Sequence, residues 1–261
     1  MSAANNHIVI IGAGNVGTHL ALLFKEQGAA VIVACRDTAS AAHLEGTGVT
    51  VVSMSDMPVN ADLYLLCLKD SVISEVAQGL PELKGVVAHT SGSIGLELLS
   101  KFPRHGVFYP FQSFRKEIPL TVKDFPILIE ASDVATEGIL MQFAAIISSS
   151  AMIVPANVRA GIHTAGVFVS NFTNLMYGAG WQVAQENGFD ADKLLRPLIE
   201  ETALRLKYMQ PSDLQTGPAI RNDRETILKH LEILEGTPEL SGLYKELTNA
   251  LLKKYGHEEL P

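Results

Sequence analysis

The chain of 261 residues is long enough for two domains, and 47% hydrophobic against 18% charged residues is typical of a globular protein rather than a disordered or fibrous one. With 20 basic against 28 acidic residues, the net charge of −8 opposes nucleic-acid binding. No apolar run reaches about 18 residues, and the start MSAANNH lacks the features of a secretory signal, so we expect no membrane span and a cytoplasmic protein.

The first predicted element is a strand over residues 7–11, HIVII, which is apolar on both faces like a parallel strand covered from both sides. The motif GAGNVG follows, and a helical apolar pattern runs from about residue 15 to 27. This order of strand, glycine turn and helix is the dinucleotide-binding fingerprint, with the helix N-terminus directed at a pyrophosphate. The alternatives are a purely structural turn and a Rossmann fold that has lost its ligand. The predicted cofactor contacts here are Gly12, Gly14, Asn15, Val16 and Gly17.

The end of the second predicted strand, AVIVA, bears on the choice between NADP and NAD. Arg36 comes directly after it and is suited to a 2′-phosphate, with Thr38 and Ser40 as hydroxyl donors at the next helix start. Asp37 argues for NAD, because NAD sites place an acidic residue near the ribose 2′-hydroxyl. The sequence favours NADP over NAD, while a solvated Arg36–Asp37 turn is the structural alternative.

Strands and helices then alternate, as in a doubly wound parallel sheet of α/β class. Loops after such strands face the ligand crevice, which makes Leu68, Lys69 and Ser91 candidate contacts. Asp70 and Ser71 can instead cap the next helix. The expected strands are residues 49–52, 61–68, 85–89, 106–108, 125–130 and 152–154, and the expected helices are residues 39–44, 72–80, 94–100 and 133–147.

From residue 155 the strand patterns stop and helices dominate, so we expect a Rossmann domain over 1–154 and a smaller all-α substrate or dimerisation domain over 155–261. At about 100° per residue, His163, Ser170 and Asn174 fall almost on one line of a long helix over residues 156–182, with Asn171 about 80° away. This polar stripe faces substrate, or else it is a set of hydrogen-bonded core residues or a dimer contact.

Further helices are expected over residues 191–208, 223–234 and 238–255. Asn222 with Glu225 resembles a capping box, and Arg221 before it is a candidate for binding a substrate carboxylate or phosphate, or simply an exposed arginine. Cys35 and Cys67 lack metal-ligand spacing and are expected to be buried thiols, so we predict no metal site.

The motifs GAGNVG, HTSGS, PFQSF, IHTAGVFVSN and TGPAIRND cover nearly the whole chain. In them the chain resembles the Rossmann-like NADP oxidoreductases with a C-terminal domain of unknown function. It is also similar to pyrroline-5-carboxylate reductase, the β-hydroxyacid dehydrogenases and the F420-dependent NADP oxidoreductases. The resemblance implies an NADP-dependent oxidoreductase that acts on a small molecule and often forms a homodimer.

Two positions depart from these families. Tyr109-Pro110 stands where His-Pro is usual, and His163 stands where the β-hydroxyacid dehydrogenases have a catalytic lysine. His163 is therefore the candidate proton donor, because histidine exchanges protons near neutral pH, with Asn171 and Ser91 orienting the reacting group. Asn174 and Arg221 are the candidate substrate contacts. The competing interpretations are a non-catalytic NAD(P)-binding regulatory protein and an enzyme whose second reactant is an F420-like deazaflavin.

Overall fold

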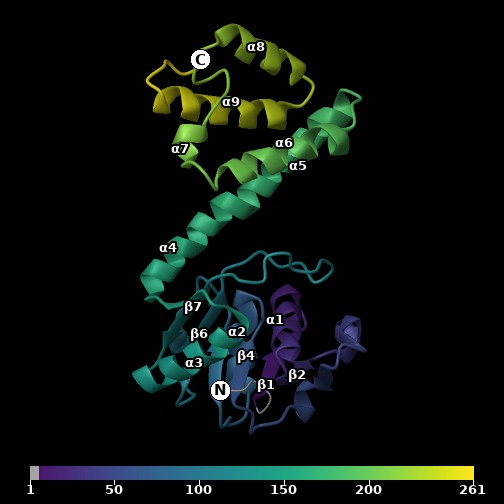
Figure 1. Ribbon diagram of the computed structural model, residues 1–261, viewed down its shortest axis with the longest axis vertical. Helices are drawn as coiled ribbons and strands as arrows, with labels where there is room; N and C mark the ends of the chain where they lie inside the picture. The colour runs from purple at the N-terminus through teal and green to yellow at the C-terminus, as the bar shows by residue number, and fades with distance from the viewer. Residues whose placement is uncertain (1–5) are drawn as a thin grey trace. The chain divides into compact units, whose positions relative to one another are not determined.

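The computed structural model describes residues 6–261, and the chain forms two compact units that divide between Ser170 and Asn171. The first unit is a sheet covered by helices, and the second is helical (Figure 1). The predicted boundary near residue 154 lies at the end of the last strand. The compact units instead divide further along the chain, inside the helical segment Val167–Phe172.

Within the described residues the sheet has eight strands in the order β3-β2-β1-β4-β5-β6-β7-β8. All neighbours are parallel except β6 and β7, and the chain order reverses between β1 and β4, which is the switch point of a Rossmann fold. The predicted fold class is therefore confirmed. The strands are β1 (His7–Ile11), β2 (Ala30–Cys35), β3 (Thr50–Ser53), β4 (Leu63–Leu66), β5 (Val86–His89), β6 (His105–Pro110), β7 (Ile127–Ala131) and β8 (Ala151–Ile153).

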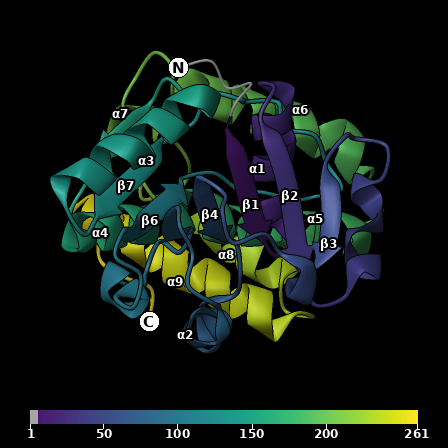
Figure 2. The same ribbon diagram turned by 90° about the horizontal axis from the view of Figure 1, so that it is seen from below.

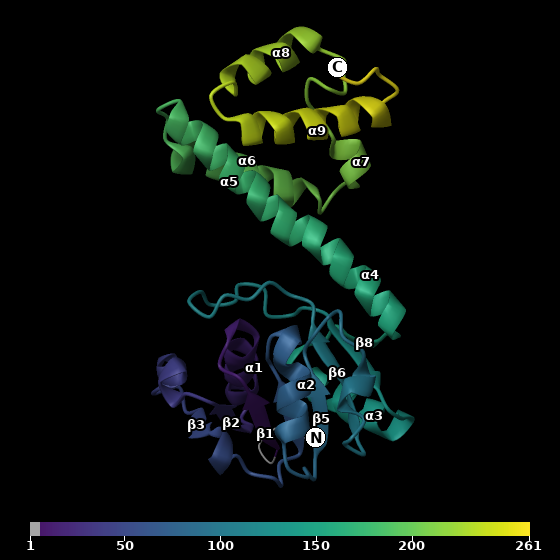
Figure 3. The same cartoon turned by 180° about the vertical axis from the view of Figure 1, so that it is seen from behind.

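The core lies in two layers, one on each face of the sheet. Successive residues of a strand point to opposite faces, so Ile10 joins one layer and Ile11 the other. Helices α1 (Asn15–Glu26) and α3 (Val134–Ile147) cover the first layer, and α2 (Asp70–Gly79) covers the second (Figures 2 and 3). This coverage explains why the strands are apolar on both faces.

Two segments expected as helices are 3₁₀ turns instead, η2 (Thr38–Leu44) and η4 (Leu96–Leu99), and η3 (Met54–Asp56) is a third. Such tight turns suit segments this short, in which an α-helix would form few complete hydrogen bonds. The connection after β6, residues 111–126, has no regular structure and passes beside the start of α1 (Figures 1 and 3).

The expected single helix over residues 156–182 is interrupted by a π-helical segment. Its parts are α4 (Ala156–Gly166), η5 (Val167–Phe172) and α5 (Thr173–Glu186). Because π turns change the angular spacing, the line drawn from His163 to Asn174 at 100° per residue does not hold. The remaining helices are α6 (Ala191–Arg205), α7 (Pro211–Leu214), α8 (Arg224–Ile233) and α9 (Pro238–Lys254).

The start of α8 corrects the predicted capping box. Asn222 has a positive φ of 54°, and its side-chain oxygen accepts from Arg224 rather than from a helix N–H group. The cap is Asp223, whose Oδ1 accepts from the backbone N–H of Thr226 at 3.1 Å.

Within residues 6–261, none of the helices has the length and apolar character needed to span a membrane.

Candidate functional site

The glycine turn after β1 has the geometry that its sequence predicts. Gly12 has φ of +107°, and a Cβ there would lie 2.6 Å from the carbonyl oxygen of Cys67. A Cβ on Gly17 would lie 2.0 Å from the carbonyl oxygen of Gly12. By contrast, no side chain or more distant backbone of the described residues lies within 4 Å of the Cβ position of Gly14. Two glycines therefore permit close packing, and the third leaves open space at the mouth of the turn.

The N-terminus of α1 faces this space with its backbone N–H groups uncapped. Gly14 is the N-cap residue and provides no side-chain bond, and the first turn contains no acidic residue. Uncapped N–H groups together with the helix dipole favour an anion. The side chain of Asn15 is engaged elsewhere, because its Oδ1 accepts from the backbone N–H of Lys116 at 3.2 Å, while Val16 packs against the core. The geometry fits a dinucleotide pyrophosphate at this turn.

At the end of β2, the two residues that bear on cofactor choice, Arg36 and Asp37, have different roles in the structure. Asp37 caps η2, since its Oδ1 accepts from the backbone N–H of Ala39 at 3.0 Å. Ser40 donates its hydroxyl to the carbonyl oxygen of Asp37 at 2.6 Å. Arg36 and Thr38 are exposed. The acidic residue thus has a structural role, and the arginine remains open to a ligand.

The loop after β4 contacts the glycine turn through Leu68, whose Cδ2 would be 3.0 Å from a Cβ on Gly12. Lys69 is exposed and is the N-cap residue of α2, although its side chain makes no capping bond. The interpretation of Asp70 as a helix cap is wrong, because it is the first residue of α2 and its Oδ2 accepts from the hydroxyl of Ser93 at 2.7 Å.

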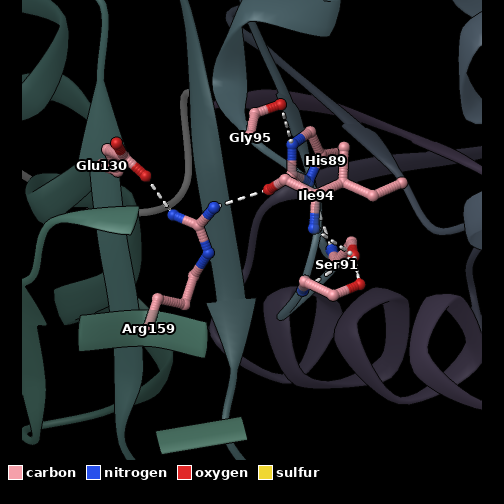
Figure 4. A network of polar contacts seen from close by, with 7 residues as sticks. His89, Ser91, Ile94, Gly95, Glu130 and Arg159 are labelled. Carbon is pink, nitrogen blue, oxygen red and sulfur yellow. Dashed lines mark hydrogen bonds and ion pairs between the residues drawn. The ribbon is translucent and has the colours of Figure 1, made fainter. Parts of the chain in front are cut away.

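The loop after β5 is shaped by Ser91 and His89. The Oγ of Ser91 accepts from the backbone N–H groups of Ser93 and Ile94, both at 3.2 Å. The backbone N–H of Ser91 donates to Nδ1 of His89, so Nε2 of His89 carries the proton and donates to the carbonyl oxygen of Gly95 (Figure 4). Burial lowers the pKa of His89 below its ordinary value. The loop is held by a neutral, buried imidazole.

His163 on α4 lies against this loop and the end of β6. Its Nδ1 is 2.9 Å from the hydroxyl of Tyr109, and the two rings meet edge to face. A Cβ on Gly92 would lie 2.8 Å from both Nδ1 of His163 and Cζ of Tyr109. Three segments far apart in the sequence therefore converge on one half-buried histidine, with Tyr109 as a partner that the sequence prediction did not include.

A second residue absent from the prediction is Arg159, one turn before His163 on α4. Its side chain is only 1% exposed, forms an ion pair with Glu130 of β7 and donates to the carbonyl oxygen of Ile94 (Figure 4). Its Nε is buried and has no partner among the described residues. Arg159 therefore ties α4 to the sheet and to the loop after β5.

The remaining site predictions lie in the second unit. Asn171 is exposed in η5, and Arg221 is exposed before α8. Asn174 is exposed on α5, where it borders a groove of about 450 Å³ together with Trp181 and Arg196. The roles of these residues remain predictions.

Both cysteines are free and buried, as expected. Burial raises the pKa of Cys67 to about 12, which makes it an inert thiol.

Comparison with known proteins matches two domain families. Residues 7–88 match "NADP oxidoreductase coenzyme F420-dependent", and residues 125–251 match a domain of unknown function, DUF2520. No curated protein matches the sequence significantly.

Among solved structures, a "putative NADP oxidoreductase" from Bacteroides fragilis is 33% identical, with 97% of this chain and 100% of that chain covered and a TM-score of 0.88. Two more distant structures share the fold. One is 1-pyrroline-5-carboxylate reductase from Streptococcus pyogenes, 16% identical over 96% of this chain and 99% of that one, with a TM-score of 0.66. The other is a reductive aminase from Aspergillus terreus in complex with NADPH and ethyl-5-oxohexanoate, 17% identical over 97% and 96%, with a TM-score of 0.64.

Proposed function

The chain belongs to the NADP oxidoreductase family of the Bacteroides fragilis protein, and we propose that it transfers hydride between NADP and a small carbonyl, imine or hydroxy metabolite. The observation that carries this proposal is the cradle after β1, where Gly14 opens onto uncapped N–H groups of α1. NADPH, when bound, supplies the hydride, and the protein must then bind the cofactor, orient the substrate and provide a proton.

Arg36 is our candidate for recognising the 2′-phosphate of NADP, with Thr38 beside it. Both are exposed directly after β2, where the adenosine ribose of a dinucleotide binds in Rossmann folds. The capping role of Asp37 supports this assignment, because a carboxylate oxygen bonded to Ala39 is less free to accept from a ribose 2′-hydroxyl. Leu68 and Lys69 are proposed as further cofactor contacts.

His163 is the proposed proton donor to the oxygen or nitrogen that hydride transfer leaves electron-rich. Its position beside Gly92 supports the role, since the loop after β5 belongs to the carboxyl edge of the sheet, where ligands of this fold bind. Asn171 and Ser91 are proposed to orient the reacting group, and Asn174 and Arg221 to contact the rest of the substrate. The two backbone bonds already accepted by Ser91 favour a role in shaping the loop for that purpose.

The imine class is the first to test. The pyrroline-5-carboxylate reductase and the reductive aminase that share the fold are named for carbon–nitrogen chemistry. A histidine that can give and regain a proton suits an imine nitrogen as well as a carbonyl oxygen.

We also propose a cytoplasmic homodimer in which residues 1–154 form the cofactor domain and 155–261 the helical substrate and dimerisation domain. The support for dimerisation is the apolar surface of the second unit: Leu175, Leu194 and Leu198 are 58%, 56% and 63% exposed. Apolar side chains in this number on one small unit are typical of a surface that another chain covers.

The direct test is turnover of NADPH with a panel of cyclic imines, ketones paired with amines, and 2-oxo acids, followed through nicotinamide absorbance. We expect one class to be reduced and His163→Gln to lower kcat at least about 100-fold while NADPH still binds. The matched control is His230→Gln, a histidine with a tyrosine partner in the second unit. Full turnover by His163→Gln would remove the proton-donor assignment, and absence of turnover despite NADPH binding would favour a regulatory role.

A further inference from the structure

Among residues 6–261, two histidine–tyrosine pairs have nearly the same hydrogen-bond and ring-to-ring distances. In the first unit, Nδ1 of His163 lies 2.9 Å from the hydroxyl of Tyr109, with ring centroids 5.8 Å apart. In the second unit, Nδ1 of His230 lies 2.8 Å from the hydroxyl of Tyr244, with centroids 5.7 Å apart. The first pair belongs to the proposed active site, and the second provides an internal reference.

The first pair is held in place from several sides. The Cβ position of Gly92 is too close to both rings for a side chain to fit. Tyr109 also packs edge to face on Phe111, which in turn lies against Gly166 of α4. One turn before the histidine, the buried Arg159 fixes the same helix. Neither ring can move far without disturbing these contacts.

The hydrogen bond between the two side chains has two possible directions, and proton transfer by His163 depends on which one forms. If the tyrosine donates, neutral His163 carries its proton on Nε2. Loss of that proton to substrate would then draw the phenolic proton onto Nδ1 and leave a tyrosinate. Burial and the charge of Asp70 both raise the pKa of Tyr109, so tyrosinate is costly here. If the tyrosine accepts, Nδ1–H stays in place while Nε2 alone gains and loses a proton.

Resting on the proposed function, we propose that Tyr109 is a positioning residue that accepts the Nδ1–H bond of His163 and thereby makes Nε2 the nitrogen that exchanges a proton with substrate. A phenolic oxygen serves this role in both states, because the imidazolium and the neutral ring carry the same Nδ1–H group. The proton leaves Nε2 for the substrate atom and returns to Nε2 from solvent, and the tyrosine keeps its own proton throughout.

The first test uses nitrogen-15 resonances of the histidine rings in the full chain, with His163 assigned from the signals lost in His163→Gln. We expect neutral His163 in the wild type to be protonated on Nδ1 and not on Nε2. Tyr109→Phe, which keeps the ring packing, should move His163 toward the Nε2–H tautomer that predominates in free histidine. An Nε2–H tautomer in the wild type, or unchanged His163 signals in Tyr109→Phe, would overturn the proposal.

The matched control is Tyr244→Phe. It should change the ring signals of His230 and leave those of His163 in place. That result would show that the loss of a tyrosine hydroxyl changes only the signals of the histidine bonded to it. Changes at His163 of equal size in both variants would contradict a specific role for Tyr109.

The second test applies once a substrate is known. Tyr109→Phe should lower kcat about fivefold to tenfold, the equivalent of one hydrogen bond, without changing the affinity for NADPH. An unchanged kcat would contradict the positioning role. The nitrogen-15 experiment needs no substrate, so failure to find a reaction would count against the proposed function and leave the test of Tyr109 intact.

Discussion

The two units of this chain differ in how completely they bury their apolar residues. The first unit encloses two core layers, one on each face of its sheet. In the described part of the second unit, the largest buried cluster has three buried members, Ala219, Ile227 and Leu252, while Leu175, Leu194 and Leu198 of α5 and α6 remain more than half exposed. A domain with so small a core gains little stability from its own packing. The first unit (residues 6–170, the cofactor half) thus has a continuous core of its own, whereas the second unit (residues 171–261, the helical half) leaves more of its apolar side chains exposed, in line with the dimer proposed above.

The largest loss of stability in the cofactor half should follow from removing the side chain of Arg159. Arg159→Met leaves Glu130 without its partner and Ile94 without a donor, and breaking a buried pair costs about 3–5 kcal/mol of unfolding free energy. Urea unfolding measures this. The control is Arg196→Met, which removes an exposed pair on α6 worth less than about 0.5 kcal/mol. Equal losses in the two variants would contradict a structural role for the buried pair.

Gly17→Ala should be the next most damaging change. Its Cβ would lie 2.0 Å from the carbonyl oxygen of Gly12, so the glycine turn must move. We expect a loss of about 1–3 kcal/mol in unfolding free energy, typical of overpacking, together with loss of NADPH binding. Gly138→Ala on α3, which has open space at its Cβ position, should be neutral or stabilising by up to about 1 kcal/mol. Normal NADPH binding by Gly17→Ala would show that the turn does not hold the cofactor.

A charged substitution among the exposed leucines of α5 and α6 should weaken the proposed dimer, whereas one on the cofactor half should not. If a second copy covers this face, Leu198→Asp will shift the protein from dimer to monomer in sedimentation velocity. Val134→Asp changes an even more exposed residue, 83% against 63%, on the cofactor half and should leave the dimer intact. A wild-type monomer at all concentrations would contradict the proposed homodimer.

The smallest expected effect is a pH dependence of the cofactor half. Burial lowers the pKa of His89 in the folded protein, so below about pH 6.5 the unfolded chain binds more protons at this position than the folded chain. This contribution to stability is complete above pH 6.5 and is lost as the pH falls through the folded value. His89→Gln should therefore flatten the acid side of a plot of unfolding free energy against pH. His7→Gln, an exposed substitution, is the control; an identical slope for wild type and His89→Gln would refute the assignment.

The sequence predicted the sheet almost strand by strand, because apolar β-branched runs and a glycine turn are local signals. It also predicted the glycine turn between β1 and α1, in which Gly12 and Gly17 pack closely and Gly14 borders open space. Contacts that no local pattern encodes were not predicted. Tyr109 and His163 are 54 residues apart in the chain, and Arg159 and Glu130 are 29 apart.

Two local expectations also failed for physical reasons. The spacing of Asn222 and Glu225 predicts a cap at Asn222, but the next residue, Asp223, has a carboxylate that caps the helix instead. The π-helical segment η5 was not foreseen, because the apolar spacing from which helices are inferred does not distinguish π from α hydrogen bonding.

The most direct test of the central claim is calorimetric titration of the purified protein with NADPH and with NADH, repeated on Arg36→Ala. We predict that NADPH binds at least about tenfold more tightly than NADH and that Arg36→Ala removes most of this difference while NADH affinity stays the same. Absence of binding by either nucleotide would contradict an NADP site in the first unit, and an unchanged preference in Arg36→Ala would contradict the role assigned to that arginine.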